Sequence, residues 1–155
     1  MAAAVAASSA RRCLLSTAAT AAPAATAVAT ATTPKKAHHQ QPPLQRVALP
    51  DGTSLECLDV PAAAGTPAHT PPIVLMHEAL GCVAWFKDLP EVLAAATGAR
   101  VFAYSRHGHG HSSPYRTAHT PRYMHVEAQE VLPAVLAARG LHRPLLVGHS
   151  DGATI

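Results

Sequence analysis

Two kinds of hydrophobic pattern alternate along the second half of the chain. Short, mostly apolar runs at 73–76, 100–104 and 145–147 are bounded by turn-forming residues, and they predict strands that are buried on both faces. Between these runs, the segments 85–97 and 121–139 repeat apolar residues at intervals typical of amphipathic helices. The order strand, helix, strand, helix, strand predicts an α/β fold with a parallel sheet covered by helices on both faces.

The two helical segments contain their own boundary signals. The first ends at Gly98, and its residues Trp85 and Phe86 are expected to pack in the core. The second begins with Thr120 as a capping residue and ends at Gly140. Because Pro133 lies inside it and has no N–H to donate, this helix is expected to bend or to restart near that residue.

The chain divides into three parts. Residues 1–36 are rich in Ala, Ser and Thr and form a leader, and residues 37–43 are polar and proline-rich, as in a linker. Residues 44–155 form the predicted folded domain. It opens with two short strand-like stretches on either side of Asp51-Gly52, a turn pair that predicts an antiparallel hairpin.

The leader has the composition of an organelle transit peptide. Residues 1–50 contain no Asp or Glu, and they carry five basic residues: Arg11, Arg12, Lys35, Lys36 and Arg46. A mitochondrial or plastid location is therefore expected; a disordered extension of a cytoplasmic protein and a secretory signal are the alternatives. Alanine and threonine are too weakly apolar for this segment to span a membrane.

Charge and cysteine content exclude several classes of protein. Without residues 1–50, the chain has 7 basic and 9 acidic residues, so the body is slightly acidic and no nucleic-acid surface is expected. Cys13, Cys57 and Cys82 show no C-x-x-C spacing. Neither a disulfide framework nor a zinc site is therefore indicated.

The pentapeptide Gly148-His149-Ser150-Asp151-Gly152 follows the third apolar run directly and fits the pattern G-x-S-x-G. Two glycines allow a sharp turn from strand to helix, which holds the serine in a strained, exposed position. A serine in this position can attack a carbonyl group if a base takes its proton and donors receive the charge that forms. The alternative is an ordinary glycine-rich turn with a surface serine.

Three segments that follow the apolar runs resemble successive signatures of the α/β-hydrolase superfamily. They are MHEALG at 76–81, YSRHGHGHS at 104–112 and GHSDG at 148–152. The resemblance covers residues 44–155 and is strongest to the branch of carboxylesterases and carbon–carbon bond hydrolases that includes pimeloyl-carrier-protein methyl ester esterases. It implies a mostly parallel sheet with a leading antiparallel hairpin, of which this chain contains the part up to the nucleophile turn.

The resemblance also implies roles for individual residues. Ser150 matches the nucleophile, and the backbone N–H groups of Asp151 and Ala79 match the oxyanion hole. The family usually has His-Gly where this chain has His77-Glu78, so the second donor is the amide of Ala79 or of the next residue. Glu78 itself is either a structural loop residue, the preferred interpretation, or a polar group that faces the pocket. No organic cofactor or metal is implied.

The alternating histidines His107, His109 and His111 have a spacing that also occurs in metal sites. A binuclear metallo-hydrolase of the β-lactamase type would have H-x-H-x-D-H, however, and the aspartate is absent. Both intervening residues are glycine, and the pattern R-x-G-x-G-x-S matches the hydrolase loop. The stretch is therefore interpreted as a hydrolase loop, with metal binding as the lesser alternative.

In this superfamily the catalytic acid and histidine follow the serine in the chain. None of the eleven histidines follows Ser150, so the 155 residues are expected to be the N-terminal part of a serine hydrolase and to be inactive alone. An inactive short isoform and a hydrolase-fold protein that only binds a ligand are the alternatives. The expected substrate is a small ester or related acyl compound, with ester, thioester and carbon–carbon cleavage all open.

Overall fold

The computed structural model describes residues 43–116 and 120–155. The chain divides into two units, 1–35 and 36–155, and the described residues all belong to the second. The predicted leader with Cys13, and the predicted linker up to residue 42, lie outside the described residues, so the expectations about them stay predictions.

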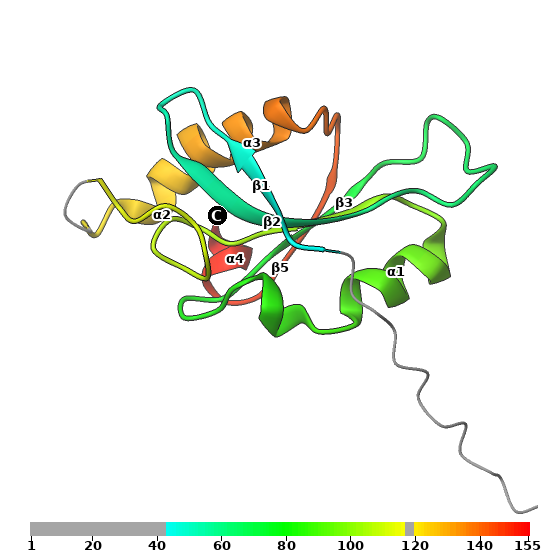
Figure 1. The fold of residues 1–155 in the computed structure, drawn as a ribbon, viewed down its shortest axis with the longest axis horizontal. Helices are drawn as coiled ribbons and strands as arrows, with labels where there is room; N and C mark the ends of the chain where they lie inside the picture. Colours follow the sequence, from blue (N-terminus) through cyan, green and yellow to red (C-terminus); the bar gives the residue numbers. More distant parts are fainter. Residues whose placement is uncertain (1–42, 117–119) are drawn as a thin grey trace, which may run out of the picture. The chain divides into compact units, whose positions relative to one another are not determined.

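A five-stranded sheet forms the centre of the described domain (Figure 1). Its order is β1-β2-β4-β3-β5, and the strands are β1 Gln45–Ala48, β2 Ser54–Val60, β3 Ile73–Met76, β4 Val101–Tyr104 and β5 Leu145–Gly148. Strand β3 pairs in parallel with both β4 and β5, whereas β2 is antiparallel to β1 and β4. The predicted leading hairpin and the predicted parallel strands are both confirmed.

The turn of the hairpin is built by Asp51 and Gly52, as the sequence predicts. Gly52 has a positive φ of 81°, which glycine adopts without a steric penalty. The Asp51 carboxylate accepts hydrogen bonds from the N–H and the hydroxyl of Thr53, at 2.9 and 2.6 Å. These bonds hold the pKa of Asp51 below its ordinary value and fix the turn that joins β1 to β2.

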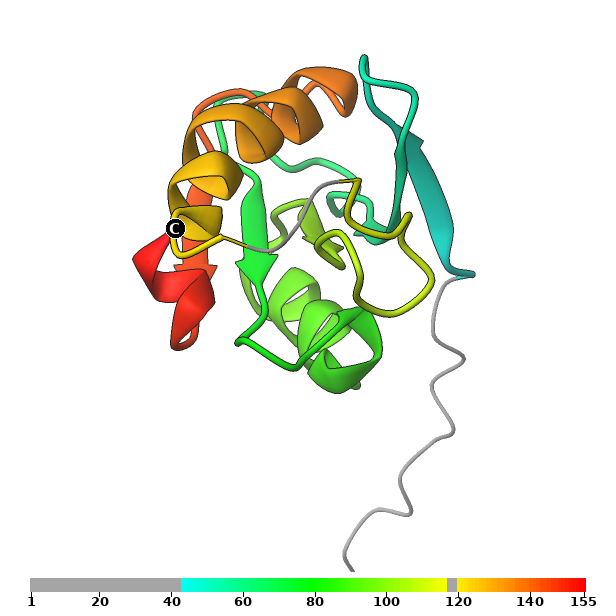
Figure 2. The same cartoon turned by 90° about the vertical axis from the view of Figure 1, so that its left-hand side faces the viewer.

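Helices cover both faces of the sheet (Figure 2). One face is covered by η1 Val83–Phe86 and α1 Leu89–Thr97; the other is covered by α2 Tyr123–Val126, η2 Glu127–Val131 and α3 Leu132–Ala138. The alternation of side chains along β3 divides the core accordingly. Ile73 and Leu75 pack on the α1 side, and Val74 and Met76 pack on the α3 side.

The first predicted helix begins later than its apolar spacing indicates. Residues 83–86 form a short 3₁₀ turn, and Lys87, with φ 52°, separates it from the α-helix that starts at Leu89. This break turns Trp85 outward, so its predicted place in the core is wrong: it is 67% exposed. Phe86 does pack against the core, and Gly98 ends the helix in a left-handed conformation as predicted.

The second predicted helix does not stop and restart at its proline; its hydrogen-bonding pattern changes there instead. A π-helical turn, η2, leads into α3 with helical backbone angles on both sides of the junction, and the N–H of Leu132 donates to the carbonyl oxygen of Glu127. The wider turn before Pro133 accommodates a residue that has no N–H to donate. The helix begins at Tyr123, so the predicted cap at Thr120 is wrong, and α3 ends at Ala138, two residues before Gly140 with φ 61°.

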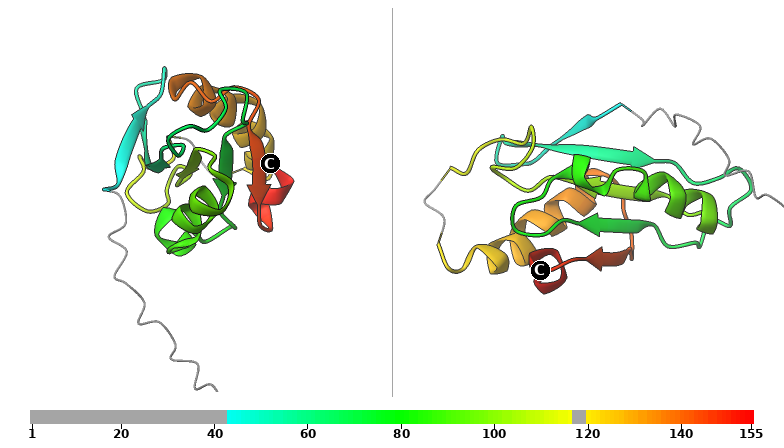
Figure 3. Two further views of the ribbon diagram at one scale, coloured as in Figure 1. Left: turned by 90° about the vertical axis from the view of Figure 1, so that its right-hand side faces the viewer. Right: turned by 90° about the horizontal axis from the view of Figure 1, so that it is seen from below.

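The third predicted strand is confirmed as β5, but the prediction that both of its faces are buried is wrong. Leu145, Leu146 and Val147 are 56, 46 and 43% exposed. The right-hand view of Figure 3 shows the reason, because β5 lies at the outer edge of the sheet and is paired only with β3. Within the described residues, no helix has the length and apolar character needed to cross a membrane.

Candidate active site

Two loops leave the same edge of the sheet side by side, because the strands before them are parallel and in register. Met76 at the end of β3 pairs with Gly148 at the end of β5. The N–H of His149 donates to the carbonyl oxygen of Met76, at 3.3 Å. The segment after β3, which contains Ala79, and the turn that contains Ser150 therefore meet at the carboxyl ends of the parallel strands.

Ser150 occupies a strained turn between β5 and the short helix α4 Asp151–Thr154. Its backbone has φ 53° and ψ −116°, a conformation that non-glycine residues rarely adopt, and its side chain is exposed. The flanking glycines are required sterically. A Cβ at Gly148 would overlap the backbone of Gly152, and a Cβ at Gly152 would overlap the carbonyl group of Met76.

The side chain of Asp151 is held by two residues from other elements. The hydroxyl group of Tyr123, on α2, donates a short hydrogen bond to the Asp151 carboxylate, and this bond raises the pKa of Tyr123. The guanidinium of Arg106 lies 3.8 Å from the same carboxylate oxygen. These contacts position the residue whose N–H the resemblance assigns to the oxyanion hole.

His77 is buried and uses both ring nitrogens in structural contacts. Its Nε2 lies 3.0 Å from the backbone N–H of Arg106, and its Nδ1 lies 2.6 Å from the carbonyl oxygen of Glu78. Because the amide can only donate, Nε2 is the acceptor and Nδ1 carries the proton. Burial, helped by the positive charge of Arg106, lowers the pKa of His77 to about 4. At neutral pH this histidine is a fixed structural group.

The side chains of Arg106 and His109 determine how the amides of the loop after β3 point. Arg106, which is 2% exposed, donates from Nη2 to the carbonyl oxygen of Glu78 at 2.9 Å, and Nε2 of His109 contacts the carbonyl oxygen of Ala79 at 2.7 Å. In a trans peptide the C=O and the following N–H point in opposite directions. The N–H groups of Ala79 and Leu80 therefore point away from Arg106 and His109.

Glu78, which stands where the family usually has glycine, folds back over its own loop. A Cβ added at Gly81 would overlap the Glu78 carboxylate, so that carboxylate lies directly above Gly81. The N–H of Gly81 also donates to the carbonyl oxygen of Glu78, at 3.2 Å. The contacts of Glu78 are thus those of a loop residue.

The three alternating histidines do not converge on one point. His107 contacts the hydroxyl group of Thr53 through Nε2, at 2.9 Å, whereas both ring nitrogens of His109 contact backbone carbonyl groups. His111 is exposed. Across residues 43–116 and 120–155, no three His, Cys, Asp or Glu side chains are grouped closely enough to hold a metal ion.

The sequence did not single out three of the residues that build this edge: Arg106, Tyr123 and Glu127. Arg106 lies two residues after the end of β4, and an arginine so close to the end of a buried strand is a signal for a buried ionic contact. Tyr123 and Glu127 lie four residues apart on the second helical segment, on one helix face. Their partners come from distant segments, so nothing local identifies them.

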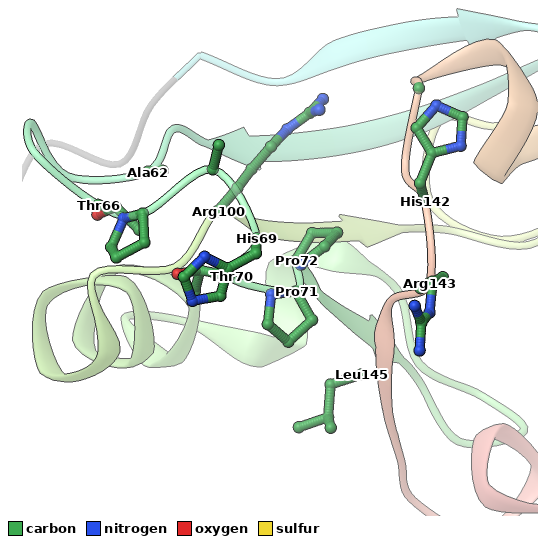
Figure 4. Close-up of a pocket in the computed structure, with 13 residues that line it drawn as sticks. Ala62, Thr66, His69, Thr70, Pro71, Pro72, Arg100, His142, Arg143 and Leu145 are labelled. Atoms are coloured by element: carbon green, nitrogen blue, oxygen red, sulfur yellow. The ribbon is translucent and has the colours of Figure 1, made fainter.

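Two hollows lie at opposite ends of the sheet. The first, of about 200 Å³, is called the acidic hollow below. It is lined by Asp51, His107, Tyr115, Arg116, Thr120, Tyr123, Val126, Glu127, Glu130 and Val131. The second, of about 790 Å³, lies at the amino ends of β3 and β5, between the loop that contains His69 and the segment with His142 and Arg143 (Figure 4). Its lining contains no acidic residue, and the guanidinium of Arg100 in its wall is paired with Asp59 at 2.6 Å.

Comparison with family models gives one match. Residues 71–155 match the model described as the alpha/beta hydrolase fold. This range is more than half of the chain, and it contains all three sequence signatures and both loops of the site. A search of curated proteins gave no match.

Solved structures with the same fold include a hydrolase from Pseudomonas aeruginosa PA01, with 26% identity and a TM-score of 0.55 over 70% of this chain. An α/β-hydrolase fold protein from Burkholderia ambifaria has 23% identity and a TM-score of 0.58 over 76% of this chain. The epoxide hydrolase VrEH1 from Vigna radiata has 16% identity and a TM-score of 0.57 over 72%. The chain spans 37, 39 and 31% of these structures, respectively.

Proposed function

This chain belongs to the α/β-hydrolase family, and we propose that it supplies the nucleophile Ser150 of a serine hydrolase that cleaves carboxylic esters through an acyl-enzyme. The observation that carries the proposal is the backbone of Ser150. Its strained φ and ψ are maintained by Gly148, which packs against the backbone of Gly152, and by Gly152, which packs against Met76 at the end of β3. The loop beside it is oriented by the buried side chain of Arg106.

In the proposed reaction, the Oγ of Ser150 attacks the ester carbonyl carbon, and the negative charge that forms on the carbonyl oxygen is stabilised by the N–H groups of Asp151 and Ala79. The alcohol leaves, and the acyl group stays on Ser150 until water releases it as the acid. Each such N–H donor contributes a factor of about 10²–10³ in rate in well-studied cases.

A base must take the proton of Ser150, and the two histidines that contact the loop after β3, His77 and His109, do not provide it. Both ring nitrogens of His77 are engaged, and so are both ring nitrogens of His109. We therefore propose that residues 1–155 alone do not turn over substrate, and that activity requires a histidine and an acid from elsewhere. The proposed substrate is a small acyl compound; ester, thioester and carbon–carbon cleavage remain alternatives.

The test compares the 155-residue polypeptide with any longer product of the same gene, using hydrolysis of p-nitrophenyl acetate and labelling by a fluorophosphonate. The longer product is expected to hydrolyse the ester and to be labelled at Ser150, and Ser150→Ala should abolish both. Thr97→Ala removes an exposed hydroxyl group that donates to the carbonyl oxygen of Leu93 on α1, away from the site, and serves as the matched control. Turnover that survives Ser150→Ala would refute the proposal, and a folded longer product that binds ligands without turnover would support a binding protein instead.

A further inference from the structure

The acidic hollow lies between the turn of the β1–β2 hairpin, the segment after β4 and the helical elements α2 and η2. Its volume of about 200 Å³ is suitable for one small functional group rather than for a whole ligand. The lining residues that matter here are Asp51, His107, Tyr115, Tyr123, Glu127 and Glu130. Three of these six are carboxylates.

Glu127 is the unusual member of this group because its carboxylate is buried without an adequate partner. The residue is 2% exposed, and its Oε2 accepts no hydrogen bond from any residue of the described chain. Its Oε1 lies 3.9 Å from Nδ1 of His107, the only cationic or titratable nitrogen within 4 Å in the described residues. Oε2 is fully covered by protein, whereas Oε1 has only this 3.9 Å contact with a described cationic or titratable nitrogen. Because a buried carboxylate normally requires several donors or a close cation, Oε1 is the oxygen placed to receive one.

The charges around the hollow favour a cationic ligand. Asp51 and Glu130 add negative charge to that of Glu127, and Arg116 is the only arginine or lysine among the lining residues. The buried guanidinium of Arg106 is not among them and lies 3.8 Å from the Asp151 carboxylate, whose charge opposes its own. Arg116 already donates from Nη1 to the backbone carbonyl oxygen of Asp51, at 2.6 Å. The rings of Tyr115 and Tyr123 add aromatic surface, which attracts cations through the negative face of the ring.

We propose that the acidic hollow binds a primary ammonium group, with Glu127 Oε1 accepting one of its N–H bonds. The free oxygen needs a hydrogen-bond donor, and a primary ammonium offers three, whereas a quaternary ammonium offers none. Tyr123 connects the hollow to Asp151, the residue after Ser150. If the proposed function holds, the amine is therefore part of the acyl substrate; the binding itself does not depend on that function.

The test is a titration of the 155-residue chain, monitored by the NMR shifts of backbone amides around Glu127. The probes are n-butylammonium, its uncharged analogue 1-butanol, and tetramethylammonium, which is charged but has no N–H. Saturable binding is expected for n-butylammonium, at least ten times weaker binding for tetramethylammonium, and none for 1-butanol. Equal binding of n-butylammonium and 1-butanol would overturn the proposal.

Glu127→Gln should weaken n-butylammonium binding at least tenfold. The matched control is Glu91→Gln, because Glu91 is also a buried glutamate without a hydrogen-bond partner among the described residues, but it lies on α1. If Glu127→Gln does not fold, Glu130→Gln on the exposed rim takes its place, with an expected weakening of two- to threefold. An equal loss in the control, or no loss in either hollow variant, would contradict the proposal.

Ser150→Ala separates this inference from the proposed function. Binding of n-butylammonium to Ser150→Ala is expected to equal that of the unchanged chain, because the hollow is built from other residues. Absence of binding together with normal labelling of Ser150 in the longer product would refute the ammonium site alone. Normal binding together with a Ser150 that never reacts would refute the hydrolase proposal alone.

Discussion

Strands β3 and β5 are parallel neighbours of four residues each, yet their environments differ sharply. All four residues of β3 are buried, whereas all four residues of β5 are exposed. The difference arises from the number of neighbours, since β3 lies between two strands and β5 has one. An apolar run thus predicts a strand, but its burial depends on which segments pair with it.

The segments that follow these strands are also maintained in different ways. The loop after β3 is held by side chains, through the contacts of His77, Arg106 and His109. The turn after β5 is held by the close approach of backbone to backbone at Gly148 and Gly152. One half of the site therefore depends on polar side-chain contacts, and the other half depends on the absence of side chains.

The largest expected effect on stability comes from replacing one leucine by alanine on each of the two strands. Leu75→Ala on β3 should lower the free energy of unfolding by about 2–5 kcal/mol, because it leaves a cavity in a closed core. Leu146→Ala on β5 should cost less than about 1 kcal/mol, because that side chain is already 46% exposed. Urea denaturation measures both values, and equal losses would show that β5 is covered in solution.

A smaller effect tests the polar half of the site. The pKa of His77 is lowered to about 4, so between pH 6.5 and 4 the unfolded chain binds a proton that the folded chain does not. Stability should therefore be complete above pH 6.5 and decline by roughly 3 kcal/mol as the pH falls to 4. Urea denaturation at a series of pH values measures this decline. In the control His77→Gln, the free energy of unfolding should change less with pH.

The smallest of the three effects tests the backbone half. Gly152→Ala places a Cβ against the carbonyl group of Met76, which cannot move without distorting β3, and should cost about 1–3 kcal/mol. Ala153→Val adds two carbon atoms at the next, exposed residue and should cost less than about 0.5 kcal/mol. Thermal unfolding compares the two. A stable Gly152→Ala with unchanged amide shifts at Ser150 would show that the turn does not depend on this contact.

The strands, the hairpin and an irregularity of the second helix near Pro133 were predictable because each depends on a local pattern. The serine turn was predictable because its glycines and its preceding strand are adjacent in the chain. The exposure of Trp85 was not, because it depends on a positive φ at Lys87 that no local signal indicates. The roles of Arg106 and Glu127 were also hidden, because their contacts join segments that are distant in the sequence.

The contact between Gly152 and Met76 also has a consequence for the folding pathway. The two residues are far apart in the chain, so the Ser150 turn cannot reach its strained conformation through local interactions. Closing such a long loop is slow, and it becomes favourable only after β3 has paired with β4. The reactive serine is thus expected to acquire its geometry late in folding, so early intermediates would carry an ordinary, relaxed serine.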